Sequence, residues 1–395
     1  MRSTSLDPRH FAKILAVNRD ILMNAKPAFA AAHCAAAQGW RPAVETCLVA
    51  LNAPADAKLG FVYATDALAG DLPAIVRALK ERTGIRHWVG SLAIGIAGGD
   101  REYFDEPALA VMAAALPDGA FRVLPNVTRP AEARRGVAGR AEEDGGAIGV
   151  VHADPRNPDL AELVAATARH AGGFLVGGLA SSRGLMRQVA GDVVEGGISG
   201  VVIASGIAVV SGLSQGCSPI GPRHTITACE RNVVFEIDGQ PALEILKQDL
   251  GQVLARRLER IGGYIHAALP VAGSDTGDYL VRNLVGIDPD RGWVAIGELV
   301  AAGDSLLFVR RDRETAEHDL ARMANQLRRR AGSAPRAGLY FSCLARGPNL
   351  FGPDSAELAI LRRALGEFPL VGMFCNGEIS NDRLYGYTGV LLLFL

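Results

Sequence analysis

The stretch AIGVVHADPRNPDLAELVAATARHAGGFLVGGLASS, residues 147–182, contains the pattern from which the architecture follows. Its first seven residues form an apolar run that is typical of a buried strand. Asp159 and Glu162 follow in the spacing of a helix capping box, ahead of apolar residues at helical period. A second apolar run, 173–182, ends in glycine and serine, and GVVIASG (200–206) adds a third. The pattern therefore predicts a strand, a helix and two further strands.

The same order of elements occurs twice more along the chain. In each copy, apolar runs of strand length flank a helix with an apolar stripe. The runs are LGFVYAT (59–65), HWVGSLAIGI (87–96) and PALAVMAAAL (107–116) in the first copy, and AGLYFSC (337–343), PLVGMFCNGE (369–378) and TGVLLLFL (388–395) in the third. We therefore predict an α/β fold, in which two related domains of mixed β-sheets are flanked by helices and contain an internally repeated strand-helix-strand-strand unit.

One glycine occupies the same place in each copy: Gly90, Gly177 and Gly372 follow the apolar opening of a strand. A glycine there permits close backbone approach or a positive φ angle. Two interpretations stay open, since the glycines either serve packing between elements or open room for a ligand. Ser91 and Ser181 follow two of these glycines, and they either cap turns or line the pocket.

Different material lies between the second and third copies. Residues 230–251 indicate a strand, a turn at Asp238-Gly239 and a helix. The segments that follow predict three antiparallel strands and then an exposed helix, at 278–288, 292–300, 304–311 and 314–330. A domain boundary near 223–240 fits this change, because PIGPRH (219–224) interrupts the pattern.

The composition excludes several classes of protein. A net charge of −1 and only 6% aromatic residues argue against a nucleic-acid partner. The uncharged segment 196–221 is rich in glycine, serine and β-branched residues, which favours two buried strands, and we expect no membrane span. The six cysteines include no C-x-x-C pair, and the N-terminus has no apolar stretch like a signal peptide. Reduced thiols and a cytoplasmic location are therefore expected.

The sequence contains no standard cofactor motif. It has neither a phosphate-binding glycine loop nor a familiar metal-ligand spacing, so we expect no cofactor and no metal. Residues 212–216 match G-x-S-x-G around Ser214, but prolines follow where a helix would have to begin. A structural turn is therefore favoured over a serine nucleophile.

Several stretches taken together resemble the FIST family, which is named after F-box and intracellular signal-transduction proteins. The central stretch runs from GGLASS (177–182) to EIDGQPALEIL (236–246). The tail is more specific and contains DYLVRN (278–283), GLYFSCLARG (338–347), PLVGMFCNGEIS (369–380) and YTGVLLLF (387–394). The resemblance covers roughly residues 40–395, and it rests on the order and spacing of these stretches.

The resemblance implies a FIST N-terminal domain over 40–228 and a FIST C-terminal domain over 229–395, after an N-terminal helical lead-in over 1–39. It also implies a non-enzymatic cytosolic sensory module for signal transduction, which binds a small ligand such as an amino acid or a derivative. We identify no output domain in the sequence, so the signal would pass to a signalling protein partner. Self-association into a homo-oligomer is left open.

Ligand recognition needs a few polar groups that converge on an apolar cleft, and strand ends that face loops are common ligand sites. The third copy supplies such groups at the ends of two neighbouring predicted strands, and one more lies in a separate predicted strand. With the aligned glycines and serines, the candidate ligand-binding residues are Arg282, Ser342, Cys343, Arg346, Asn376, Glu378, Gly372, Gly177, Ser181 and Ser91. We assign no catalytic residue.

We expect Arg282 or Arg346 to bind a ligand carboxylate through the guanidinium fork, and Glu378 to bind its amine. The alternative is that Arg346 and Glu378 pair with each other and brace the loops. Two other functions stay open. A hydrolase or transferase would use Cys343 or a serine as nucleophile, although Cys343 and Cys375 also fit as small buried apolar residues. A structural adaptor would bind no small molecule.

Overall fold

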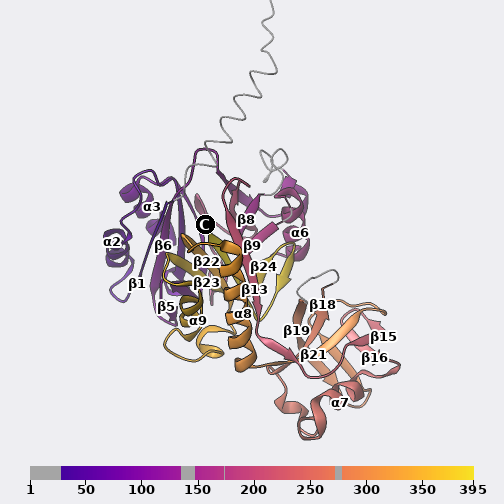
Figure 1. Ribbon diagram of the computed structural model, residues 1–395. Coiled ribbons are helices and arrows are strands. Elements are labelled where there is room, and N and C mark those ends of the chain that lie inside the picture. Colours follow the sequence, from indigo (N-terminus) through magenta and orange to yellow (C-terminus); the bar gives the residue numbers. More distant parts are fainter. Residues whose placement is uncertain (1–27, 135–146, 173, 272–277) are drawn as a thin grey trace, which may run out of the picture. The chain divides into compact units, whose positions relative to one another are not determined.

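The computed structural model describes residues 28–134, 147–172, 174–271 and 278–395. The chain divides into two compact units (Figure 1). The first contains the described residues up to Leu213 together with Ala321–Leu384 and Gly389–Leu395, and the second contains Ser214–Leu320 and Tyr385–Thr388. The predicted α/β class is confirmed, because helices alternate with strands in mixed parallel and antiparallel sheets.

The expected N-terminal lead-in is described only in part. Its residues 1–27 lie outside the described residues. Ala28–Ala35 form strand β1 rather than a helix, and β1 pairs antiparallel with the last strand of the first copy.

The first unit contains three sheets of six strands each among its described residues. The first sheet has the order β1, β6 (Ala108–Ala115), β2 (Leu59–Thr65), β3 (His87–Ala93), β10 (Gln188–Ala190) and β11 (Asp192–Val194). The second has β25 (Arg383–Tyr385), β24 (Glu378–Ser380), β9 (Phe174–Leu179), β8 (Ile148–Ala153), β12 (Ile198–Ile203) and β7 (Phe121–Val127). The third has β13 (Val209–Gln215), β26 (Thr388–Phe394), β22 (Ala337–Cys343), β23 (Leu370–Cys375), β4 (Gly95–Gly98) and β5 (Arg101–Phe104).

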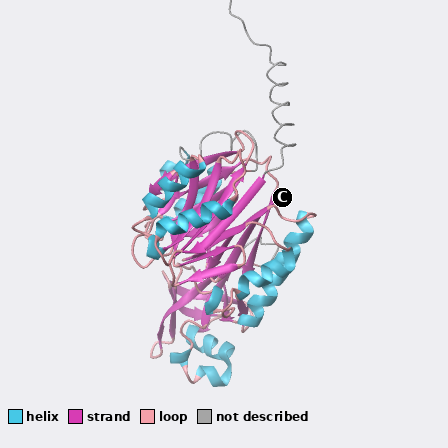
Figure 2. Ribbon diagram, turned by 90° about the vertical axis from the view of Figure 1, so that its left-hand side faces the viewer, coloured by secondary structure: helices cyan, strands magenta, loops and turns pink. Residues whose placement is uncertain are grey.

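The repeated unit is confirmed by the strand pairing. In every copy the first strand is central, pairs parallel with the strand after the helix and pairs antiparallel with the last strand. The helices between the parallel strands are α3 (Leu72–Thr83), α6 (Leu160–His170) and α9 (Ala356–Leu365). The apolar strands are buried because both faces of each sheet are covered, and Figure 2 shows helices on the outside of the strands.

The three aligned glycines have the same structural role. Each faces the middle of the central strand of its copy, where a Cβ atom would meet a backbone carbonyl oxygen. The distance would be 1.7 Å at Gly90, 1.8 Å at Gly177 and 1.9 Å at Gly372. Since real Cβ atoms do not approach an oxygen so closely, glycine is required there for close approach of two strands. This geometry supports the packing interpretation of the glycines.

A hairpin from each copy pairs with a strand of another copy. The sequence did not indicate this exchange. Hairpin β4–β5 of the first copy pairs with β23 of the third. Hairpin β10–β11 of the second copy pairs with β3 of the first, and hairpin β24–β25 of the third pairs with β9 of the second. The three copies therefore interlock in a ring.

The inner faces of the three sheets share one apolar core. Tyr63, His152 and Phe341 occupy the same position in the three copies, and their rings lie in mutual contact with centroids 5.5–6.2 Å apart. The Tyr63 hydroxyl forms a hydrogen bond of 3.1 Å with His152 Nε2. Burial lowers the pKa of His152 to about 3, so the imidazole is neutral. On the outer face of the first sheet, α2 (Trp40–Leu51) and α3 cover a second core (Figure 1).

The second unit is built on an antiparallel sheet, as predicted. Its strands are β14 (Cys217–Pro219), β21 (Ser305–Arg311), β15 (His224–Glu230), β16 (Val233–Ile237), β20 (Trp293–Ile296), β19 (Tyr279–Asp288) and β18 (Ile265–Pro270), with β17 (Gln240–Pro241) beside β16. Helix α7 (Ala242–Ala255) packs on this sheet through Leu243 and Leu246. The Asp238-Gly239 turn is confirmed, with positive φ at both residues. Helix α8 (Arg313–Ala331) begins within the second unit and ends within the first.

The uncharged segment forms strands, as expected from its composition. Strands β12, β13 and β14 lie in it; β12 is buried as expected, whereas β13 is mostly half-buried. No helix among the described residues has the length and apolar character needed to cross a membrane. Ser214 lies within β13, and strand β14 follows it instead of a helix. The strand-to-helix turn that a serine nucleophile of this motif requires is therefore missing at Ser214.

Candidate functional site

Arg346 and Ser342 lie in a closed polar cluster at the carboxyl end of β22. Arg346 is fully buried, and its Nε donates hydrogen bonds to Glu357 Oε1 at 2.8 Å and to Ser342 Oγ at 3.1 Å. The Tyr340 hydroxyl donates to the same carboxylate at 2.6 Å, and the Gly347 N–H donates to its other oxygen at 2.8 Å. The cluster therefore ties the loop after β22 to α9. Glu357 is not among the candidate residues selected from the sequence.

A hairpin from another copy completes the cluster. Glu102 of β5 accepts a hydrogen bond from the Leu358 N–H at 3.1 Å, and its own N–H donates to Ser355 Oγ at 2.8 Å. Burial and the nearby charge of Glu357 raise the pKa of Glu102 to about 8. The hairpin β4–β5 thereby caps the first turn of α9, the helix that carries Glu357.

Ser181 and Ser91 join the copies through their hydroxyl groups. Ser181 Oγ donates to the Phe374 carbonyl at 2.6 Å and accepts from the Ile94 N–H at 3.0 Å, so it links all three copies. Ser91 Oγ contacts the backbone carbonyls of Leu92 at 3.0 Å and Arg187 at 3.4 Å. Both hydroxyls therefore have backbone partners at sheet junctions.

The remaining predicted residues of the first unit gather where β22, β23 and β24 meet. Cys343 and Cys375 are register partners on parallel strands, and Glu378 faces Gly178 of β9 across the sheet. Burial raises the pKa of the Cys375 thiol well above its ordinary value, with the charge of Glu378 adding to the effect. Cys343 is half-buried and Asn376 is exposed, so these two present surface to solvent.

Arg282 is the candidate that lies outside the first unit. It belongs to the second unit, in β19, and its Nε donates to Glu298 Oε2 at 2.8 Å. The structure therefore divides the candidates of the first unit between the Arg346 cluster, the junction of β22, β23 and β24, and the serines at sheet junctions, and it assigns Arg282 to a separate unit.

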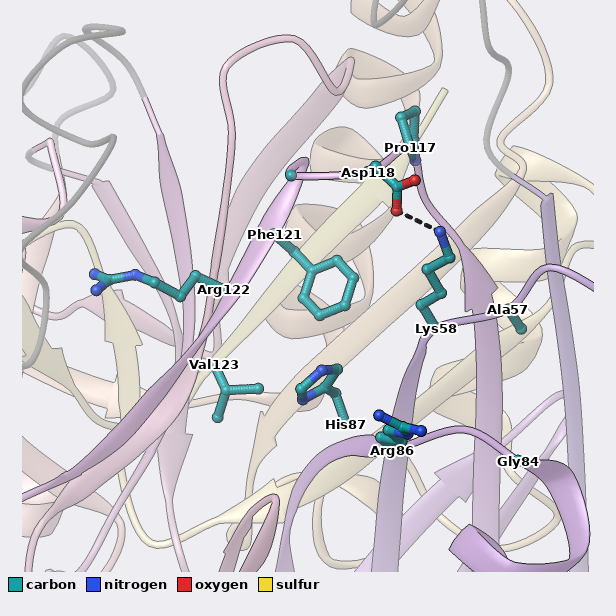
Figure 3. Close-up of a pocket in the computed structure, with 11 residues that line it drawn as sticks. Ala57, Lys58, Gly84, Arg86, His87, Pro117, Asp118, Phe121, Arg122 and Val123 are labelled. Carbon is teal, nitrogen blue, oxygen red and sulfur yellow. Dashed lines mark hydrogen bonds and ion pairs between the residues drawn. The ribbon is translucent and has the colours of Figure 1, made fainter.

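Sequence reasoning missed a pocket of about 490 Å³ at the amino ends of β2 and β3 (Figure 3). Lys58 directly precedes β2, Arg86 directly precedes β3, and His87 opens β3. The turn after β6 supplies Asp118, and β7 supplies Phe121. The full lining is Ala57, Lys58, Gly84, Arg86, His87, Pro117, Asp118, Gly119, Phe121, Arg122 and Val123. These residues come from loops and strand starts, where no periodic pattern marks them.

The charges that line the pocket are mostly positive. Lys58, Arg86 and Arg122 are cations, whereas Asp118 is the one carboxylate among the residues of the lining. Lys58 forms an ion pair with Asp118, and Arg86 forms no ion pair within the described part of the chain. All four side chains are exposed to solvent. A guanidinium that is both open and unpaired is suited to a carboxylate or another small anion.

An aromatic surface lies beside these cations. The rings of His87 and Phe121 meet edge to face, with centroids 5.6 Å apart, and Figure 3 shows both between Lys58 and Arg122. The Arg122 side chain extends away on the far side of Phe121. A ligand in this pocket would therefore contact charged side chains of the protein on one side and an apolar ring on the other.

Comparisons with known proteins identify the family. The FIST N domain matches residues 58–240 and the FIST C domain matches residues 242–381. Relatives from two strains of Mycobacterium tuberculosis are 31% identical over 342 residues, which covers 82% of this chain and 87% of theirs. A relative from Mycobacterium bovis is 28% identical over 354 residues, with 85% and 89% covered. All three are described only as uncharacterized proteins.

Proposed function

This chain belongs to the FIST family of sensory signalling domains, and from that premise we propose that it binds a small organic anion, an amino acid or a related carboxylate, in the pocket of Lys58 and Arg86. The observation that carries the proposal is the exposed Arg86 guanidinium beside Lys58, in a pocket of about 490 Å³. An arginine fork matches a carboxylate in two hydrogen bonds. Asp118 lies across the pocket and would take the ammonium group of an amino acid.

The proposal includes a non-enzymatic role. A hydrolase or transferase needs a nucleophile with a base beside it. The Ser181 hydroxyl donates to a backbone carbonyl, and the Cys375 thiol has a raised pKa, which favours the unreactive protonated form. We further propose that the signal passes to a partner protein in the cytoplasm, in line with the signalling role of the FIST family.

The residues singled out from the sequence remain a second proposal for the position of the ligand. Cys343 and Asn376 have exposed surface at the carboxyl ends of β22 and β23, so a ligand could contact them without opening the Arg346 cluster. The two proposals predict a loss of ligand affinity in different variants.

A thermal-shift screen against amino acids and simple carboxylates tests the proposed function. A ligand at 100 times its Kd adds about 2.7 kcal/mol to the free energy of unfolding, which raises Tm measurably. Arg86→Ala should weaken binding roughly 10- to 100-fold, because it removes a charged hydrogen-bond donor. The matched control is Arg169→Ala, on the exposed end of α6, which should bind as the wild type does. Equal affinity in the Arg86 and Arg169 variants would exclude the pocket.

The Asp118→Asn variant distinguishes the two ligand classes. It removes the carboxylate that would hold an ammonium group and releases Lys58 from its ion pair. An amino acid should then bind more weakly, whereas a carboxylate without an amine should bind as tightly as before or more tightly. If both classes lose affinity equally, Asp118 has no part in recognising an amine.

A further inference from the structure

Two cysteines of the first unit lie in contact outside the proposed ligand pocket. Cys34 is in strand β1 and Cys47 is in helix α2, and their sulfur atoms are 3.6 Å apart. Both are free thiols in the structure. Strand β1 is at the edge of the first sheet and pairs only with β6 among the described strands. An edge strand and the helix packed on it can adjust to each other more easily than two central strands can, because fewer hydrogen bonds hold them.

The two thiols differ in their surroundings. Cys34 is half-buried, so a small reagent can reach it, whereas Cys47 is fully buried on the inner face of α2. Cys47 lies beside the Leu109 carbonyl at 3.8 Å, and Cys34 lies beside the Ala43 carbonyl at 3.4 Å. The hydrogen bond from Cys47 stabilises a thiolate at Cys34 and lowers the pKa of that thiol, while the same hydrogen bond and burial raise the pKa of Cys47. Cys34 is thus the thiol suited to attack, and Cys47 the thiol suited to resolve.

We propose that Cys34 and Cys47 are a redox-sensitive modification site, which a peroxide converts to a reversible disulfide between β1 and α2. In the first step the Cys34 thiolate attacks one oxygen of the peroxide. A sulfur–oxygen bond forms, the oxygen–oxygen bond breaks, and the leaving hydroxide takes a proton to become water. In the second step Cys47 loses its proton and attacks the Cys34 sulfur. The disulfide forms, and the hydroxyl group of the sulfenic acid leaves as water. Two thiols and one hydrogen peroxide give one disulfide and two waters.

The disulfide would join β1 to α2 covalently and close the short loop between them. A cross-link over a loop of this length restricts the unfolded chain, so the oxidised protein should unfold at a higher temperature than the reduced protein. The site and the anion pocket share no residue, so oxidation and ligand binding can be measured independently.

Peptide mapping of the full chain after treatment with hydrogen peroxide tests the proposal without any substitution. We expect the peptides of Cys34 and Cys47 to appear as one linked species that has lost two hydrogen atoms, and dithiothreitol to separate them. The linked species should form at a peroxide concentration that leaves glutathione largely reduced in the same time. If both residues remain thiols while glutathione is oxidised, the proposal is overturned.

Two variants assign the roles of the thiols. Cys47→Ser should accumulate a sulfenic acid at Cys34 that dimedone traps, because the resolving thiol is missing. Cys34→Ser should yield neither the disulfide nor the trapped acid. Cys229→Ser is the matched control, since Cys229 is a half-buried free thiol in the second unit, and it should form the disulfide as the wild type does. Trapping at Cys47 rather than at Cys34 would overturn the assignment of the attacking thiol.

Discussion

The carboxyl and amino ends of the parallel strands in the first unit use charged residues in opposite ways. At the carboxyl end of β22, Arg346 and Glu357 form an ion pair that is fully buried. At the amino ends of β2 and β3, Lys58 and Arg86 are exposed around an open pocket. Both places combine arginine with a carboxylate near a strand end. Burial decides the role, since a buried pair serves the fold and an exposed guanidinium can serve a ligand.

The largest expected effect is at the closed end. Glu357→Ala leaves the Arg346 guanidinium buried without this carboxylate, and it should lower the free energy of unfolding by about 3–5 kcal/mol. Urea denaturation measures it. The control is Glu367→Ala, because the Glu367 carboxylate is exposed and paired with Arg362. This variant should lower the free energy of unfolding by about 0–1 kcal/mol. Equal losses of unfolding free energy in the two variants would show that burial does not determine the role of the charged residues at the two ends.

Substitution of the aligned glycine Gly90, in the middle of β3, should lower the stability nearly as much. Gly90→Ala places a Cβ atom 1.7 Å from the Val62 carbonyl oxygen, so the strands must separate. We expect a loss of about 3 kcal/mol or more in the free energy of unfolding, measured by urea denaturation. Gly70→Ala is the control, because a Cβ there meets no atom within 4 Å, and it should be close to neutral. A neutral Gly90→Ala variant would contradict the common role of the three glycines.

An effect that is smaller at each pH step, but spread over several pH units, is expected in the core between the two ends. The folded-state pKa of His152 is about 3, below its ordinary value of 6.5, so the unfolded chain binds a proton first as pH falls. The stability contributed by neutral His152 is complete above pH 6.5 and is lost toward pH 3, by about 1.4 kcal/mol per pH unit. His152→Gln should flatten this dependence in urea titrations at several pH values. An unchanged pH dependence of the free energy of unfolding would mean that other titratable groups cause it.

The smallest effect on stability is expected at the open end. Lys58→Ala removes an exposed ion pair and should change the free energy of unfolding by less than about 1 kcal/mol. The same variant should weaken anion binding, because one of the pocket's cations is lost. Urea denaturation and a binding titration on one sample measure both quantities. A large loss of stability with unchanged binding would reverse the roles of the two ends.

Much of the fold could be predicted because its signals are local. The three strand-helix-strand units follow from apolar runs and helix stripes, and a glycine, Gly84, ends α3 in the left-handed conformation. The exchange of hairpins could not be predicted, since the pairing of β4 with β23 joins residues far apart in sequence. The family was identified from motif order, and the comparisons confirm it.

The site was harder to predict than the fold. Sequence reasoning placed Arg346 at a strand end, but it could not show that Glu357, in the first turn of the next helix, would form a buried ion pair with it. Lys58, Arg86 and Asp118 lie in short connections, where neither period nor motif distinguishes them from ordinary surface charges. The ligand-binding role of the sequence-selected residues stays a prediction.

A calorimetric titration that compares Arg86→Ala with Asn376→Ala tests the central claim most directly. The two variants alter the amino-end pocket and the carboxyl-end surface, and both side chains are exposed, so neither should impair folding. With the carboxylate or amino acid that gives the largest thermal shift, we predict wild-type affinity for Asn376→Ala and an affinity roughly 10-fold or more lower for Arg86→Ala. Wild-type affinity for Arg86→Ala, with a loss for Asn376→Ala, would contradict the account and favour the carboxyl ends as the ligand site.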